Sequence, residues 1–160
     1  MTQPGGCGNG EERVRAEALK IIDLHRILPR LVVFDLDYTL WPFYCECCYE
    51  DEMPHLCPQI DMAISSRSPT SEIAKRFLNK FGIRSIFVAK TRKREHFDKI
   101  HWTTGVPYSR MLFFNDENRN IEVVSKMGVT SIYVNNGVNL RALREGLLSF
   151  SHKCGSSGAV

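Results

Sequence analysis

The stretch "RLVVFDLDYTLWPF", residues 30–43, joins an apolar run to two closely spaced aspartates. The run LVVF has the apolar character of a strand that is buried on both faces. Asp35 and Asp37 follow it two residues apart, so their side chains are expected on the same face. Two carboxylates that close raise each other's pKa unless a cation neutralises them. Because no Lys or Arg lies between Arg30 and Arg67, the stretch predicts a site for an external cation such as Mg²⁺.

Around this stretch, segments typical of strands alternate with segments typical of helices. An amphipathic helix is expected before it, over residues 11–30, ending at Pro29. The expected strands cover residues 31–37, 60–66, 83–90, 110–116 and 130–136, and the later helices cover 70–82, 94–105, 118–128 and 139–150. This alternation predicts an α/β fold with a doubly wound parallel sheet. Ligands of such sheets bind beyond the carboxyl ends of the strands.

Composition and charge bound the classes of protein to consider. The chain has 160 residues, 43% hydrophobic and 24% charged, with a formal net charge of +3, which suits one globular domain. We expect that domain over residues 11–150, a disordered tail over 1–10 and a flexible tail over 151–160. The basic cluster at 90–94 is interpreted as a solvated loop, with no nucleic-acid partner. No apolar segment suits a secretory signal or a membrane span, which predicts a soluble, cytoplasmic protein with no membrane partner.

Cysteines and histidines offer a possible metal site of a different kind. Four cysteines crowd together, at positions 45, 47, 48 and 57. Their spacing differs from the paired knuckles of zinc sites, so reduced thiols are the preferred interpretation. His25, His96 and His101 fall on expected helices without forming a metal pair, and solvated or half-buried imidazoles are expected there.

The remaining strand ends add groups that bind phosphate or metal. Ser66 and Arg67 follow the second expected strand, and both can donate to phosphate oxygens. Lys90 and Lys93 follow the third, where a lysine could hold a phosphoryl group as a point charge. Asp116 ends the fourth and adds another carboxylate. Together these side chains predict a phosphoryl-transfer site at one edge of the sheet.

The same residues carry a resemblance to a known family. The pattern D-x-D-x-T at residues 35–39, followed by a serine, a lysine and an acidic residue, resembles the haloacid dehalogenase (HAD) superfamily. The longer strings "VVFDLDYTLWPF" (32–43) and "TGVPYSRMLFFNDENRNI" (104–121) resemble the magnesium-dependent phosphatase 1 family, in a form similar to plant members, and the resemblance covers roughly residues 12–150. It implies a HAD-like Rossmann-type fold and a Mg²⁺-dependent phosphomonoesterase. The implied substrates are small phosphorylated molecules such as sugar phosphates, or phosphotyrosine, and the implied intermediate is an aspartyl phosphate.

The resemblance also implies a role for each matching residue. Asp35 would be the nucleophile and a Mg²⁺ ligand, and Asp37 would be the proton donor and base, touching the metal through its backbone carbonyl. Asp116 would be the remaining protein ligand of the metal. Lys93 is preferred to Lys90 because "KREHF" matches the family's Lys-x-x-His-Phe. The implied phosphate-binding groups are the Leu36 backbone and the side chains of Ser66, Arg67 and Lys93.

The chain departs from the family pattern in three places. Asn115 stands where an acid is usual, which is expected to weaken Mg²⁺ binding or the orientation of Lys93. Residues 41–59 are too few for both a substrate-facing flap and a crossover helix, so the crossover after the first strand is shortened. The loop over residues 90–96 is also shorter than in the family. These departures predict a purified chain of low thermal stability.

Two other functions remain open at the level of sequence. A truncated, catalytically weak or inactive isoform could keep the phosphate pocket and act as a binding or regulatory module. A receiver domain that is phosphorylated on aspartate shares the fold class and the acids, but Thr39 and the Ser66-Arg67 step favour a phosphatase.

Overall fold

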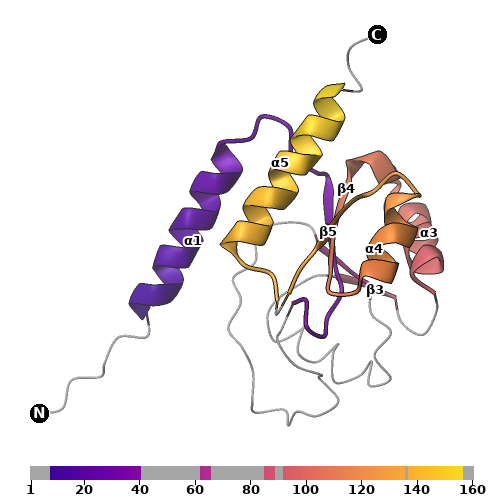
Figure 1. Ribbon diagram of the computed structural model, residues 1–160, viewed down its shortest axis with the longest axis horizontal. Helices are drawn as coiled ribbons and strands as arrows, with labels where there is room; N and C mark the ends of the chain where they lie inside the picture. Colours follow the sequence, from indigo (N-terminus) through magenta and orange to yellow (C-terminus); the bar gives the residue numbers. More distant parts are fainter. Residues whose placement is uncertain (1–7, 41–61, 66–84, 89–91, 136, 157–160) are drawn as a thin grey trace, which may run out of the picture.

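A five-stranded parallel sheet forms the centre of the molecule in the computed structural model, which describes residues 8–40, 62–65, 85–88, 92–135 and 137–156 (Figure 1). The strands are β1 (Leu31–Phe34), β2 (Met62–Ser65), β3 (Ser85–Val88), β4 (Met111–Asn115) and β5 (Thr130–Tyr133). Their order is β3-β2-β1-β4-β5, and every pair is parallel. The chain therefore winds outward from β1 in both directions, which confirms the predicted α/β doubly wound sheet.

The reversal of winding falls at β1, beside β4. In the register of the sheet, Val33 pairs with Ala63 of β2 on one side and with Phe113 of β4 on the other. The Asp35 backbone N–H donates to the carbonyl of Phe114 at 3.2 Å, so the ends of β1 and β4 stay level. At such a reversal the two connections leave in opposite directions and open a crevice above the strand ends.

Helices cover both faces of the sheet. Helix α1 (Gly8–Asp23) packs beside α5 (Leu140–Ser156) on one face, and α3 (Lys93–Thr104) packs beside α4 (Asn118–Ser125) on the other (Figure 1). A short 3₁₀ turn, η2 (Tyr108–Arg110), leads into β4. Within the described part of the chain, no helix is long and apolar enough to cross a membrane.

Alternate residues of β4 supply the two cores. Phe113 faces α3, where its ring meets Phe97 edge-on with centroids 4.9 Å apart. Phe114 faces α5 and stacks on Phe34 with centroids 5.5 Å apart. All five residues of β4 are buried, and the first four are apolar, as a strand covered on both faces requires. The fifth, Asn115, is the first polar side chain and lies at the carboxyl edge.

The terminal helices extend into both of the predicted tails. Helix α1 begins at Gly8, inside the predicted tail over 1–10, and α5 continues to Ser156, well into the predicted tail over 151–160. Tertiary contacts hold the last turns of α5, since Lys153 Nζ donates to the Gly128 carbonyl at 2.8 Å. Helix α1 also ends at Asp23, before Pro29.

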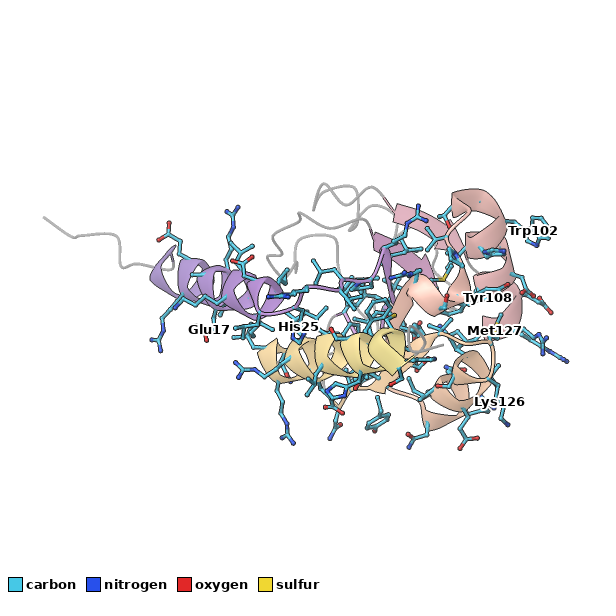
Figure 2. All side chains as sticks on the ribbon, turned by 90° about the horizontal axis from the view of Figure 1, so that it is seen from above. Glu17, His25, Trp102, Tyr108, Lys126 and Met127 are labelled. Carbon is cyan, nitrogen blue, oxygen red and sulfur yellow. The ribbon has the colours of Figure 1, made fainter. Side chains whose placement is uncertain are left out.

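Several sequence predictions lie outside the described residues. They are the helix over 70–82, the shortened connection over 41–59, and the cysteines at positions 45, 47, 48 and 57. Figure 2 shows Trp102 at the outer end of α3, where it points away from the sheet. Its exposed fraction is 83%, so it adds nothing to the core.

Candidate active site

A tight turn carries the aspartate pair out of β1. The Leu36 carbonyl accepts the backbone N–H of Thr39 at 3.1 Å and that of Leu40 at 2.8 Å. Tyr38 has a φ of 54°, in the left-handed region that residues other than glycine rarely adopt. The turn keeps Asp35 and Asp37 at the carboxyl edge of the sheet, and an uncommon backbone conformation at such a place is typical of functional sites.

The loop after β5 holds this turn in place through backbone hydrogen bonds. Gly137 donates to the Tyr38 carbonyl at 3.0 Å, and Val138 donates to the Thr39 carbonyl at 2.7 Å. Gly137 has a φ of 95°, and a Cβ there would lie 3.6 Å from the Thr39 carbonyl oxygen. The positive φ would strain a residue with a side chain at this position, whereas the 3.6 Å contact itself is an ordinary one.

Lys93, the first residue of α3, reaches the aspartate at the end of β1. Its Nζ donates to Asp35 Oδ1 at 2.7 Å and also to the Ser65 carbonyl at the end of β2. The lysine side chain is 2% exposed and that of Asp35 is 16% exposed, so this ion pair is largely removed from water. The ammonium also lies 5.9 Å from the centroid of the Phe113 ring. Helix α3 thus brings a positive charge to the carboxyl edge of the sheet.

Asp116 joins the same edge from the end of β4. Thr39 Oγ1 donates to Asp116 Oδ1 over 3.5 Å, a long hydrogen bond. Burial raises the pKa of Asp116, and the nearby charge of Asp35 raises it further. Burial also raises the pKa of Asp35, although the attraction of Lys93 partly opposes that rise. Asp35 is paired with the Lys93 ammonium, and the second carboxylate beside it, Asp116, favours a further cation at this edge.

The donor set at this edge fits a small, hard cation. Among the described residues, no three His, Cys, Asp or Glu side chains gather closely enough to hold a metal ion. Asp35 and Asp116 alone would supply carboxylates, and a backbone carbonyl and waters would complete the ligands. Mg²⁺ commonly binds in this way, through one or two carboxylates and several waters.

Asn115 lies at the end of β4, but its side chain contacts the segment that leads into α4. Its Oδ1 accepts the Glu117 backbone N–H at 2.6 Å and the Asn120 side-chain amide at 3.4 Å. Its Nδ2 is buried and has no hydrogen-bond partner among the residues that the structure describes. The oxygen that could have replaced an acidic ligand is therefore engaged in holding the start of α4.

The predicted site residues divide into two groups. Asp35, Leu36, Asp37, Lys93 and Asp116 come from β1, α3 and the end of β4 to one edge of the sheet. The predicted phosphate-binding Ser66 and Arg67, together with the alternative Lys90, lie outside the described residues.

The burial of His96 differs from the sequence prediction. The expectation of a solvated or half-buried imidazole was wrong, because His96 is completely buried and its Nδ1 forms a 2.8 Å hydrogen bond with Ser65 Oγ. Its spacing from Lys93 was the available signal, since residues three apart lie on one face of a helix.

Comparisons with known proteins agree with this fold. The chain matches the acid phosphatase family over residues 27–56 and 49–153. It is 36% identical over 155 residues to human magnesium-dependent phosphatase 1, covering 78% of this chain and 88% of the human protein. It is 29% identical over 144 residues to a HAD-like hydrolase superfamily protein of Schizosaccharomyces pombe, covering 64% of this chain and 83% of that protein.

A solved structure shares the fold. It is the N-terminal part of a Bacteroides fragilis protein, containing a phosphatase domain complexed with Mg. The TM-score is 0.59 with 16% identity, over 85% of this chain and 43% of that one.

The family match defines the class of the chain, which is a phosphatase of the acid phosphatase family. Within that class, the chain belongs to the magnesium-dependent phosphatase 1 family. The resemblance noted in the sequence is thereby confirmed.

Proposed function

We propose that this chain is a Mg²⁺-dependent phosphomonoesterase whose nucleophile is Asp35. The observation that carries the proposal is the buried contact of Lys93 Nζ with Asp35 Oδ1 at 2.7 Å, beside a second acid at Asp116. Phosphoryl transfer needs positioning and the neutralisation of charge on the phosphoryl oxygens more than it needs complex covalent chemistry. The edge of the sheet offers an attacking carboxylate and an ammonium within reach of each other.

In the first step, a carboxylate oxygen of Asp35 attacks phosphorus and the bond to the ester oxygen breaks. Asp37 gives its proton to that leaving oxygen, and Asp35 becomes an aspartyl phosphate. In the second step, Asp37 takes a proton from a water that attacks phosphorus, which releases orthophosphate and restores Asp35. One carboxylate therefore forms the bond and the other moves the proton.

The groups around these two acids neutralise the negative charge of the carboxylates and of the phosphoryl oxygens. Lys93 balances the Asp35 carboxylate before reaction and the phosphoryl oxygens during it. The backbone N–H of Leu36, with Ser66 and Arg67, is proposed to hold the substrate phosphate. Mg²⁺ would be held by Asp35, Asp116 and the Asp37 carbonyl, and when bound it supplies positive charge that stabilises the transferring group. The substrate class proposed here is a small phosphorylated molecule, a sugar phosphate or phosphotyrosine.

The test is turnover of p-nitrophenyl phosphate by the full chain. We expect activity with Mg²⁺, none with EDTA, and a loss of at least about 10³-fold in Asp35→Asn, because the amide cannot attack phosphorus. Sugar phosphates and a phosphotyrosine peptide, assayed side by side, decide the substrate class. Activity that survives both EDTA and the substitution would refute the assignment.

A phosphate-binding module without turnover is the second candidate. One observation favours it: Asn115 stands where the family pattern usually has an acid, and its oxygen already accepts the backbone N–H of Glu117, the residue before α4. A folded chain that binds orthophosphate in calorimetry and hydrolyses none of these substrates would support this second function.

A further inference from the structure

A buried imidazole lies one helical turn beyond Lys93 and has no part in the proposed chemistry. His96 and Ser65 are both completely buried, and Ser65 Oγ and His96 Nδ1 share a 2.8 Å hydrogen bond. Buried polar groups that lose their partner carry a penalty, so this bond is costly to break. Ser65 is the last residue of β2, directly before the proposed phosphate-binding residues Ser66 and Arg67.

Lys93 and His96 contact the same residue of β2. Lys93 Nζ donates to the Ser65 carbonyl, while His96 bonds to the Ser65 hydroxyl. Because positions three apart are neighbours on a helix surface, these two side chains leave α3 on the same face. Two side chains from the first turn of α3 therefore contact Ser65 at the end of β2, and Lys93 also contacts Asp35.

Within the described residues, the start of α3 lacks a side-chain cap. Its N-cap residue, Arg92, makes no side-chain capping hydrogen bond. A lysine side chain is a flexible four-carbon chain that ends in a compact ammonium, so the side chain alone does not fix where the ammonium lies. The Ser65–His96 bond is thus well placed to determine where the helix begins relative to β2.

We propose that His96 is a positioning residue for Lys93. Through its hydrogen bond with Ser65, it fixes the first turn of α3 and so holds the lysine ammonium against the Asp35 carboxylate. This inference rests on the proposed function only for its effect on turnover. Its effect on the position of Lys93 is a property of the folded chain alone.

The first experiment measures the position of Lys93 without any turnover. The full chain is treated with a lysine-acetylating ester, and the rate of modification at Lys93 is measured by peptide mass spectrometry relative to exposed Lys99 on the same helix. We expect the relative rate of Lys93 acetylation to rise about tenfold in His96→Ala and in Ser65→Ala. The loss of one buried hydrogen bond changes an equilibrium constant by about that factor, and here the equilibrium is between the paired and the released lysine. His96→Asn, whose amide can reach the same hydroxyl, should stay near the native rate.

The second experiment measures kcat and KM for p-nitrophenyl phosphate with Mg²⁺. We expect kcat of His96→Ala to fall about tenfold with KM changed less than about threefold, since a misplaced ammonium weakens the transition state most. His96→Asn should recover most of kcat. The matched control is His101→Ala, which removes another imidazole hydrogen bond of α3, to the Val106 carbonyl, away from the site. This control should change neither kcat nor acetylation of Lys93.

The outcomes separate the two proposals. A native chain without turnover sinks the proposed function, while the acetylation rates still decide the role of His96. Lys93 acetylation at the native rate in a folded His96→Ala chain would overturn the inference, as would a His96→Asn chain no better than His96→Ala. If His96→Ala fails to fold, Ser65→Ala, which leaves the carbonyl in place, decides in the same way.

Discussion

Lys93 is the residue on which the charge balance of the site depends. Replacing it by Met removes the partner of a largely buried carboxylate while keeping the length of the side chain. We expect kcat to fall at least about 10²-fold. The unfolding free energy of the metal-free chain should fall by about 3 kcal/mol, because Asp35 is left uncompensated. Kinetics with p-nitrophenyl phosphate and urea unfolding in EDTA measure the two effects.

Lys99→Met is the matched control for that substitution, because Lys99 is exposed on the same helix. It should leave kcat unchanged and alter stability by no more than about 0.5 kcal/mol. Equal losses in the two variants would mean that helix α3, and not the ion pair, is responsible.

Asp116 should show opposite effects on stability and on activity. Burial and the charge of Asp35 raise its pKa, so its ionised form is unfavourable in the metal-free fold. Asp116→Asn removes that charge with little change of shape, and we expect a higher Tm in EDTA at pH 7. The same substitution should abolish both turnover and the rise in Tm on adding Mg²⁺. A lower Tm in EDTA, measured by calorimetry, would contradict the raised pKa.

The pH dependence of that difference follows from the direction of the shift. A carboxyl whose pKa is raised on folding contributes stability that is fully present below its ordinary value of 3.8 and is lost as pH rises through the raised value. The native chain therefore recovers stability as acid is added, whereas Asp116→Asn has no such group to protonate. We expect the Tm gap between the two, in EDTA, to narrow as pH falls from 7 toward 4. A gap that widens would be the opposite of this expectation.

At the scale of elements, α5 lies against the sheet at one close point. A Cβ on Gly146 would lie 2.9 Å from Phe114 Cζ and 3.3 Å from Leu112 Cδ2. Gly146→Ala should therefore lower the unfolding free energy by about 1–3 kcal/mol through overpacking, despite the better helix propensity of alanine. Gly155→Ala in the same helix, where no described atom lies within 4 Å of the new Cβ, should be neutral or slightly stabilising. Thermal melts of both variants provide the comparison.

Elements and strand ends could be predicted from sequence because they depend on local pattern. The apolar strands and the side chains that end them, such as Asp35 and Asp116, follow from periodicity and from the geometry of parallel sheets. Contacts between distant segments could not be predicted. One example is the hydrogen bond from the Gly137 N–H to the Tyr38 carbonyl, and another is the bond between the Ser65 hydroxyl and buried His96. Both depend on tertiary packing between segments that are far apart in the sequence. The end of α5 was misplaced for the same reason, because Lys153 is held by the Gly128 carbonyl.

At the scale of the whole molecule, Mg²⁺ should contribute to stability as well as to chemistry. The winding reverses at β1, so the acids that would share the ion come from the two halves of the sheet, Asp35 after β1 and Asp116 after β4. A ligand that binds only the folded chain raises its stability by mass action, by about 2.7 kcal/mol at a hundred times the Kd. In EDTA we expect the chain to melt below about 45 °C, the lower end of the mesophilic range, and saturating Mg²⁺ to raise Tm by about 5 °C.

This thermal experiment needs two controls, one that removes a proposed ligand of the ion and one that disturbs only the packing of the core. Asp116→Asn should melt at the same temperature with and without Mg²⁺, because one of the two carboxylates that would hold the ion is missing. Gly146→Ala should lose stability overall yet keep the full Mg²⁺-dependent rise, since the atoms nearest to the new Cβ belong to the side chains of Phe114 and Leu112, which are not proposed ligands of the ion. A cooperative melt of the native chain at an ordinary mesophilic temperature in EDTA, unchanged by Mg²⁺, would show that the ion joins nothing. The two halves would then be held by the backbone pairing of β1 with β4 and by the apolar cores.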